Sequence, residues 1–342
     1  RQTEDGSVAF RPLEGGEYGF GVDGLTLGAD ATLGAGWSAR VTLMGGRMGK
    51  LVNQFSGESG AVAIPEAQLV WTGKQDKVTI GRMNTYIGME FTDGTQNITA
   101  SRGLLFTYAA PFTQVGFAWR HTFTSAWSTD VFLFNGEDRI QDNNHGKTLG
   151  VGLNYNHDGA SDKFFSLSAY RGAEQDGLGA NANTGAEGRK RDRLSVLGQW
   201  VWGSSTLQGE FEYGREAFLP AAIAGTVGTK NVNADWMGLG LIYKHQINAA
   251  WALFARAEYF KDDAGVRLNG DTTIAAAYGV TLNADLKATS FTIGTERKWG
   301  ATFSRFELRQ DALNKDLTEG IGGNHKAFRN ATSATLSFGT SF

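Results

Sequence analysis

The residues best suited to chemistry in this chain are charged side chains that recur at every second position. The clearest run is Arg305, Glu307 and Arg309, in which an acidic residue stands between two basic ones. Two-residue spacing places side chains on one face of a β-strand. Fixed charges of both signs on such a face suit a wall that contacts water and hydrated solutes. The full set of candidates is Arg40, Glu66, Arg120, Asp130, Arg193, Glu210, Glu212, Arg256, Glu258, Arg305, Glu307 and Arg309.

Apolar residues occupy the positions between these charges, as Leu239, Leu241 and Tyr243 illustrate. A basic side chain on a lipid-facing surface costs about 2–4 kcal/mol near the membrane midplane. An unpaired charge buried in a dry core costs more. A water-filled interior behind an apolar outer face removes both costs. We therefore predict that the strands enclose a lumen and that the charged candidates line a pore.

Other kinds of chemistry have weaker support. The histidines are scattered without the short spacing of metal ligands, and neither a G-x-S-x-G motif nor a phosphate-binding loop occurs. The segment Gly136–Gly146 is rich in oxygen ligands for Ca²⁺ but lacks the spacing of an EF-hand, which favours a solvated loop. We expect no catalytic residue, no metal and no cofactor.

The elements that position the charged residues are segments of alternating polarity. A shorter segment at Ser7–Pro12 is a further candidate strand. The others are Tyr18–Leu33, Trp37–Arg47, Ala63–Thr72, Lys77–Thr85, Thr113–Thr124, Trp127–Asn135, Lys147–Asn156, Lys163–Arg171, Arg193–Gly203, Ser205–Glu216, Ala234–His245, Ala249–Lys261, Leu286–Lys298, Ala301–Gln310 and Asn330–Phe342. Helical periodicity is weak throughout, which predicts an all-β fold.

The connectors between these segments alternate between short and long. Gly34–Gly36 and Gly203–Ser204 are short, whereas Met48–Val62 and Tyr86–Phe112 are long. Short turns at one end and long loops at the other are typical of a transmembrane antiparallel up-and-down β-barrel. We predict about 16 strands, or about 14 if one pair is divided wrongly, with short periplasmic turns and long extracellular loops. Residues 1–342 are expected to form a single outer-membrane β-barrel domain.

The composition agrees with this interpretation. No apolar run approaches the ~20 residues of a membrane-spanning helix, but a barrel strand needs only alternate apolar residues. The 342 residues include only 4 prolines, which suits long paired strands. Cysteine is absent and the net charge is −3, so there is no basic excess for nucleic acid. The chain begins at Arg1 without a signal peptide, which we interpret as a mature, processed protein.

The segment Ser333–Phe342 alternates in polarity and ends on an aromatic residue. It resembles the C-terminal signature of Gram-negative outer-membrane barrels, in which the final Phe is recognised by the barrel assembly machinery. This resemblance implies a location in the bacterial outer membrane and predicts contact between Phe342 and that machinery. Membrane lipid, lipopolysaccharide and small hydrophilic solutes complete the expected partners.

The longest loop, Tyr86–Phe112, mixes polar residues with apolar ones. Such a loop either folds into the lumen as a constriction or forms a lid on neighbouring loops, and the sequence does not separate the two. The candidates for a constriction are Glu90, Asp93, Asn97 and Arg102. A basic run at 189–193 either contacts lipopolysaccharide phosphates and biases anion entry, or forms a plain charged rim.

One stretch carries a family resemblance. It comprises GRMNTYIGMEF at Gly81–Phe91, Asn97, SRGLLF at Ser101–Phe106, APFTQVG at Ala110–Gly116, FNGED at Phe134–Asp138 and DNNHGKTLG at Asp142–Gly150. These motifs resemble the putative β-barrel porin-2 (OmpL-like) family of Gram-negative outer-membrane proteins. The resemblance implies a channel-forming porin. It fixes no substrate and carries over no catalytic residue.

The sequence thus predicts an outer-membrane porin that forms a water-filled channel for passive diffusion of small hydrophilic solutes. Because the acidic and basic candidates nearly balance, we do not expect strong ion selectivity. Two alternatives stay open: a barrel that acts as a scaffold or sheath for a partner protein, and an outer-membrane lipid-modifying enzyme. The second would need a lipid-facing His beside a Ser, and His121 shows no such Ser in the sequence.

Overall fold

The structure is a computed structural model that describes residues 19–177, 186–218, 232–268, 285–319 and 326–342. Contacts group the chain into two compact units. Unit 1 holds Met89–Ala109 and Gln199–Phe342, and unit 2 holds Val22–Gly88 and Ala110–Gly198. The expected single domain stays a prediction. The expected strand at Ser7–Pro12 lies outside the described residues.

The described residues form 15 strands, and each matches one of the predicted alternating segments. In chain order they are β1 Leu25–Gly34, β2 Trp37–Gly45, β3 Ala63–Thr72, β4 Asp76–Asn84, β5 Thr113–Thr122, β6 Trp127–Glu137, β7 Thr148–Asn156, β8 Phe164–Ala173, β9 Lys190–Trp202, β10 Ser205–Phe218, β11 Val232–Gln246, β12 Trp251–Asp262, β13 Leu286–Trp299, β14 Thr302–Glu319 and β15 Lys326–Thr340. The predicted all-β fold is confirmed.

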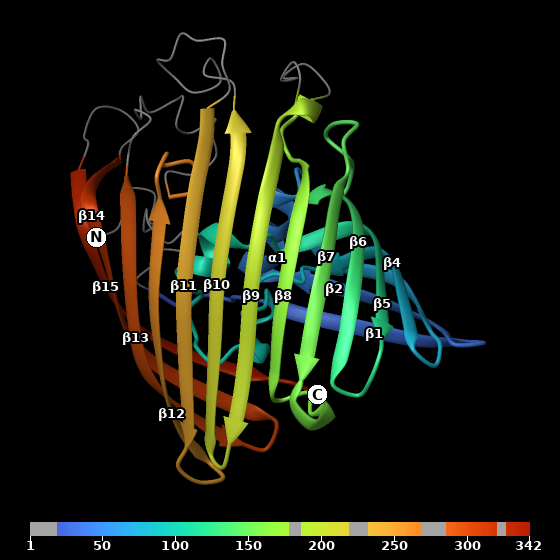
Figure 1. Ribbon diagram of the computed structural model, residues 1–342. Coiled ribbons are helices and arrows are strands. Elements are labelled where there is room, and N and C mark those ends of the chain that lie inside the picture. The colour runs from blue at the N-terminus through green and yellow to red at the C-terminus, as the bar shows by residue number, and fades with distance from the viewer. Residues whose placement is uncertain (1–18, 178–185, 219–231, 269–284, 320–325) are drawn as a thin grey trace. The chain divides into compact units, whose positions relative to one another are not determined.

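The strands are hydrogen-bonded in sequence order, from β1 to β15, in one up-and-down sheet (Figure 1). A short turn links β1 to β2, and the two strands pair antiparallel. β10, β11 and β12 pair in the same antiparallel manner, with register pairs such as Glu210↔Gly240 and Gly240↔Glu258. Directly paired residues share one face of the sheet. The register therefore places Glu210 and Glu258 on the same face.

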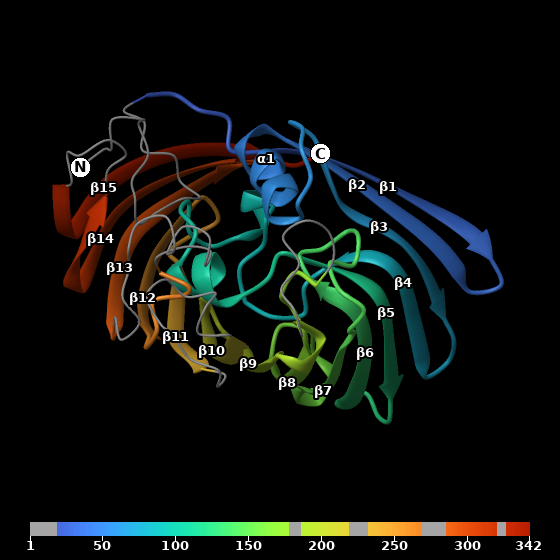
Figure 2. The ribbon, with the colours of Figure 1, turned by 90° about the horizontal axis from the view of Figure 1, so that it is seen from above.

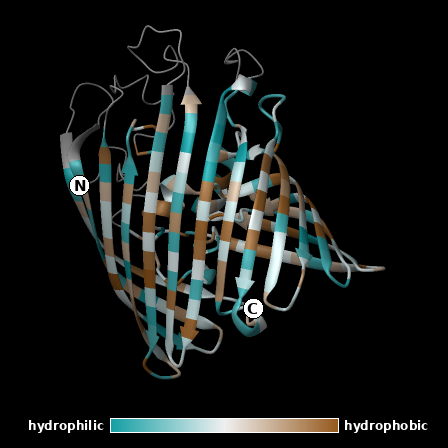
Figure 3. Ribbon diagram, in the orientation of Figure 1, coloured by the Kyte–Doolittle hydropathy of each residue, from teal (hydrophilic) through white to brown (hydrophobic). Residues whose placement is uncertain are grey.

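The two faces of the sheet differ in character, as the alternating colours along the strands in Figure 3 show. One face, which we call the outer face, exposes large apolar side chains such as Leu239, Leu241, Phe291 and Leu308. Exposed aromatic residues adjoin the short turns on this face: Trp37, Phe123, Trp127, Trp202, Trp251 and Trp299. The opposite inner face carries the predicted charged positions.

In the part of the chain that the structure describes, four short helical segments and one longer helix lie between the strands, and the longer helix was not predicted. The short ones are η1 Gly94–Gln96, η2 Leu105–Ala109, η3 His157–Gly159 and η4 Ala186–Gly188. The longer helix, α1 Gly46–Phe55, buries Met48 and Val52 at i, i+4 spacing. Its first residues have no side-chain cap and no acidic residue, so the usual start signal is missing. Among the described residues, no helix has the length and hydropathy needed to cross a membrane.

Arg82 on β4 is buried although its position in the alternation points outward. Its guanidinium donates to the hydroxyls of Ser56 (2.6 Å) and Thr113 (3.0 Å). A bulge at Gly81 would be one way to turn this side chain inward, but the register between β3 and β4 is continuous there, so no bulge is present at Gly81. Instead, Gly81 has φ +125°, a conformation that favours glycine and redirects the chain without an extra residue.

Candidate functional site

The candidate site is the long loop of unit 1, residues 89–109, where it lies on the inner face of β10 to β14 (Figure 2). The loop contains the 3₁₀ turn η1 and the π-helical turn η2. Charged side chains of the strands bond to its backbone. Glutamates accept hydrogen bonds from its N–H groups, and arginines donate hydrogen bonds to its carbonyl groups.

Three inner-face glutamates hold the loop through its backbone N–H groups. Glu210 of β10 accepts from Met89 N (3.0 Å), and Glu258 of β12 accepts from Leu105 N (3.1 Å). Glu307 of β14 accepts from two successive donors, Ala100 N (2.8 Å) and Ser101 N (3.1 Å). A hydrogen bond to a charged group contributes about 1.5–3 kcal/mol. The glutamates therefore fix the loop at both ends and in the middle.

Three inner-face arginines bind the loop carbonyl oxygens. Arg256 of β12 donates to Ser101 O (2.7 Å). Arg305 of β14 donates to Gly94 O (2.9 Å), and Arg309 donates to Arg102 O (2.5 Å). These three side chains also pair with carboxylates of the strands or the loop. The same residues thus join strand to strand and strand to loop.

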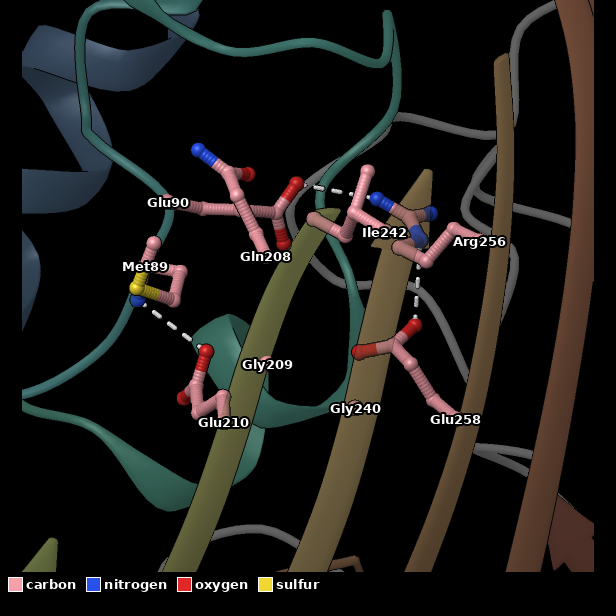
Figure 4. Close-up of a pocket in the computed structure, with 9 residues that line it drawn as sticks. All are labelled: Met89, Glu90, Gln208, Gly209, Glu210, Gly240, Ile242, Arg256 and Glu258. Carbon is pink, nitrogen blue, oxygen red and sulfur yellow. Dashed lines mark hydrogen bonds and ion pairs between the residues drawn. The ribbon is translucent and has the colours of Figure 1, made fainter. Parts of the chain in front are cut away.

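Arg256 lies at the centre of this arrangement, in the small pocket of Figure 4. Its guanidinium pairs with Glu90 of the loop (2.9 Å) and with Glu258 (3.1 Å), and it is 1% exposed. Glu90 in turn accepts from Gly103 N (2.6 Å). The predicted pore-lining arginine and the predicted loop carboxylate therefore form one buried ion pair. Removing one member of a buried pair costs about 3–5 kcal/mol, which makes Arg256 the main anchor of the loop.

The underside of the loop is apolar and packs on glycines of β11. A Cβ at Gly238 would lie 2.8 Å from Leu105 Cγ, so only glycine leaves room for that side chain. Leu104, Leu105 and Tyr108 join Trp236 and Phe260 in one buried cluster. The alternation of glycine with leucine on β11 was the available signal, because glycine inside a strand often marks the close approach of another segment. The glycines of β11 were therefore missed as contact positions for the loop.

The other three constriction candidates shape the loop from within. Asp93 accepts from Thr95 N (2.9 Å) and caps η1. The Asn97 amide bonds to both backbone groups of Phe91, at 2.7 and 2.9 Å. Arg102 donates to the carbonyls of Phe91 and Thr92. Glu90, the fourth candidate, contacts a strand residue through its ion pair with Arg256.

Most of the remaining pore-lining candidates bond to a neighbouring polar or charged side chain. In unit 2, Arg120 binds Asp130 through two bonds of 2.7 and 2.8 Å. Four further candidates complete the set: Arg40 pairs with Asp30, Glu66 accepts from Thr42, Arg193 binds Glu137, and Glu212 is fully buried on β10. The inner face therefore carries charges mainly as bonded pairs, which the sequence alone did not indicate.

The basic run at 189–193 is also bound within unit 2. Arg191 and Arg193 both donate to Glu137 at 2.6 Å, and Arg189 donates to Gln175. Beyond the end of β8, Glu174 accepts from Glu137 N and from the Thr148 hydroxyl. Burial and the nearby Glu137 carboxylate raise the pKa of Glu174 to about 7. Burial likewise raises the pKa of Asp138 to about 6.

Two histidines have neighbours that partly resemble a hydrolase site. His121 contacts Asp76 at 2.8 Å, and the same Asp76 oxygen accepts from Trp119. Ser205 lies 3.0 Å from His245 Nδ1, and its hydroxyl also contacts the Tyr243 hydroxyl. Neither pair forms a Ser–His–carboxylate set through the bonds of the described residues. In the part of the chain that the structure describes, no group of three or more His, Cys, Asp or Glu residues is arranged to hold a metal ion.

Comparison with known proteins gives a family and a fold. A model of the family described as "Putative beta-barrel porin-2, OmpL-like" matches residues 19–342. An anion-selective porin from Comamonas acidovorans is similar in structure, with 13% identity, a TM-score of 0.56, and 92% of this chain and 88% of that chain covered. The outer membrane channel DcaP of Acinetobacter baumannii has 8% identity and a TM-score of 0.55, with 92% and 84% covered.

A trimer form of OmpT from Vibrio cholerae is similar too, with 12% identity, a TM-score of 0.55, and 93% and 89% of the two chains covered. Comparison with curated proteins gives no match. Because the family model matches nearly the whole chain, the protein belongs to the OmpL-like β-barrel porin-2 family. It is a β-barrel channel of the bacterial outer membrane, in contact with membrane lipid, through which small solutes diffuse.

Proposed function

We propose that loop 89–109, held on the inner face of β10 to β14, is the constriction that sets the width of this porin. The observation that carries the proposal is the set of bonds from Glu210, Glu258 and Glu307 to loop N–H groups. Bonds from the strand arginines to the loop carbonyl oxygens support it further. Backbone bonds of this kind hold a loop at a fixed height, so the passage beside it has a defined size.

Diffusion then depends on the space left beside the loop and on charges that remain in contact with water. Solutes exchange part of their hydration shell for polar groups on the wall as they pass. The same proposal includes a pore-lining role for the other charged candidates, a single barrel domain and the absence of catalysis. The proposed partners also include lipopolysaccharide and the barrel assembly machinery, which would recognise Phe342, and the Phe342 side chain is exposed.

The test displaces the loop without changing any charge. In the variant Gly238→Leu, the new side chain occupies the place of Leu105 and forces the loop off β11. We expect larger conductance steps in planar bilayers and faster uptake of sugars into liposomes. Gly28→Leu on β1 is the matched control, because a Cβ at Gly28 meets no atom within 4 Å.

The outcomes separate the proposal from its alternatives. Conductance of Gly238→Leu equal to that of the wild type would show that the loop does not limit the passage. A folded wild-type protein without any conductance would favour the sheath for a partner protein. Release of fatty acid from phospholipid by the same preparation, abolished by Ser205→Ala, would favour the lipid enzyme instead.

A further inference from the structure

The charges of unit 1 are largely withdrawn from water by the loop. Arg256, Glu258, Arg305, Glu307 and Arg309 are each less than a tenth exposed. Each one bonds to the loop backbone or to an opposite charge, so its field is compensated at short range. A count of charges along the inner face therefore misjudges the field that a solute meets. The exposed, uncompensated charges decide that field.

Lys77 of β4 is such a charge. It is paired directly with Arg120 of β5 in the register of the two strands, so both side chains lie on the inner face of unit 2. Lys77 is exposed, and among the described residues it forms no hydrogen bond and no ion pair through its side chain. Like charges directly opposite each other on a sheet are destabilising. The two cations lie side by side despite this cost, which indicates a functional role for the pair.

The nearest inner-face carboxylate is already occupied. Asp130 of β6 lies opposite Arg120, which binds both of its oxygens, and Asn154 donates to Oδ2 at 2.7 Å. The Asp130 side chain is 5% exposed, whereas the Arg120 side chain is 40% exposed. Asp130 therefore neutralises Arg120 in part and forms no ion pair with Lys77. At this point Lys77 and part of the Arg120 guanidinium meet water, whereas the Asp130 carboxylate is nearly buried.

We propose that Lys77, with the exposed part of Arg120 beside it, forms a binding step for small anions and gives this porin a preference for anions over cations. Lys77 supplies a mobile ammonium group with three donors, and Arg120 supplies the guanidinium N–H groups that Asp130 leaves free. Chloride and small carboxylates match this pair. The inference rests on the proposed pore-lining role of the inner face.

The test is the ion selectivity of single channels in planar bilayers, measured from reversal potentials in gradients of potassium chloride and potassium acetate. We expect the wild type to pass both anions more readily than potassium. In Lys77→Gln, the anion-to-potassium permeability ratio should fall about two- to fivefold, as expected for the loss of one water-exposed charge at moderate salt. Lys77→Glu should reverse the preference, and Lys77→Arg should keep it.

Lys74→Gln is the matched control, because Lys74 is an exposed lysine on the turn between β3 and β4, three positions from Lys77. Its permeability ratio should stay at the wild-type value. A wild-type channel that prefers potassium, or a Lys77→Gln channel with an unchanged permeability ratio, would overturn the inference. In both cases the measured conductance would still support the porin function. A fall for chloride alone, with acetate unchanged, would limit the step to inorganic anions and refute the carboxylate part. Absence of all conductance would overturn the pore-lining role and this inference together.

Discussion

Replacement of Arg256 by alanine is the perturbation that most directly loosens the loop. Arg256 pairs with Glu90 and Glu258, and it donates to Thr99 Oγ1 (2.8 Å), Ser101 O (2.7 Å) and Ser101 Oγ (3.0 Å). Its removal leaves two buried carboxylates without their cation. The cost of breaking a buried pair in this way is about 3–5 kcal/mol. The population of undocked loop should therefore rise by roughly a hundredfold to several thousandfold, since each 1.4 kcal/mol is about tenfold.

Amide hydrogen exchange of residues 89–109 measures this population directly. We expect the amides of Met89, Ala100, Ser101 and Leu105 to be protected in the wild type, because each donates to a strand carboxylate. In Arg256→Ala their protection should fall by the factor given above, while the strand amides keep theirs. Conductance should rise in the same variant, because the displaced loop no longer narrows the passage.

A matched control and a rescue make the measurement specific. Arg215→Ala breaks the exposed pair of Arg215 with Asp235 on β10 and β11, and exposed pairs contribute only ~0–1 kcal/mol. Loop protection should not change in this variant. In the triple variant Arg256→Met, Glu90→Gln and Glu258→Gln, the two carboxylates that lost their cation are replaced by neutral amides. This variant should recover part of the amide protection that Arg256→Ala loses. Equal protection in Arg256→Ala and Arg215→Ala would refute the anchoring role of Arg256.

Three further predictions concern other parts of the molecule. The pKa of Glu174 is raised from 4.5 to about 7 in the folded state, so the folded state keeps a proton that the unfolded state releases. The stability of the segment beyond β8 should therefore be greatest below pH 4.5 and fall as the pH rises to about 7. Proteolysis at varied pH measures this trend, and Glu174→Gln should remove it. Gly103→Ala should lower loop protection, since the added Cβ would lie 2.2 Å from Glu258 Oε1 and 2.6 Å from Glu90 Oε2; full protection would contradict that crowding. Arg193→Ala should lower the free energy of unfolding by about 2 kcal/mol through loss of its two charged bonds to Glu137, whereas Arg171→Ala, which breaks an exposed pair with Asp192, should change it by less than about 1 kcal/mol in denaturant titrations.

The strands were predictable from the sequence because their signal is local. Alternation over about ten residues fixes both the strand and its two faces, so the segment Ala63–Thr72 coincides with β3 at both ends. The helix α1 was missed because it is short and lacks a capping residue at its start. Its stability comes from packing against β2 and β3 in unit 2, which no local pattern encodes.

The charged residues were found, but their partners were not. Glu307 bonds to Ala100 and Ser101, which lie 207 and 206 residues away along the chain. Bonds to backbone groups leave no complementary residue type in the sequence, because every residue except proline carries the same donor and acceptor. The candidates Glu90 and Arg256 were both identified, yet their pairing follows only from the path of the loop across the strands. Alternation thus reveals the charged face, whereas the loop determines which charges contact water.

A crystal structure of the protein, at a resolution that places side chains, tests the central claim most directly. The account predicts loop 89–109 on the inner face of β10 to β14, with the Glu307 carboxylate accepting from both Ala100 N and Ser101 N and the Arg256 guanidinium within 4 Å of Glu90. A loop folded away from these strands, with Glu307 and Arg256 in contact with solvent, would contradict it.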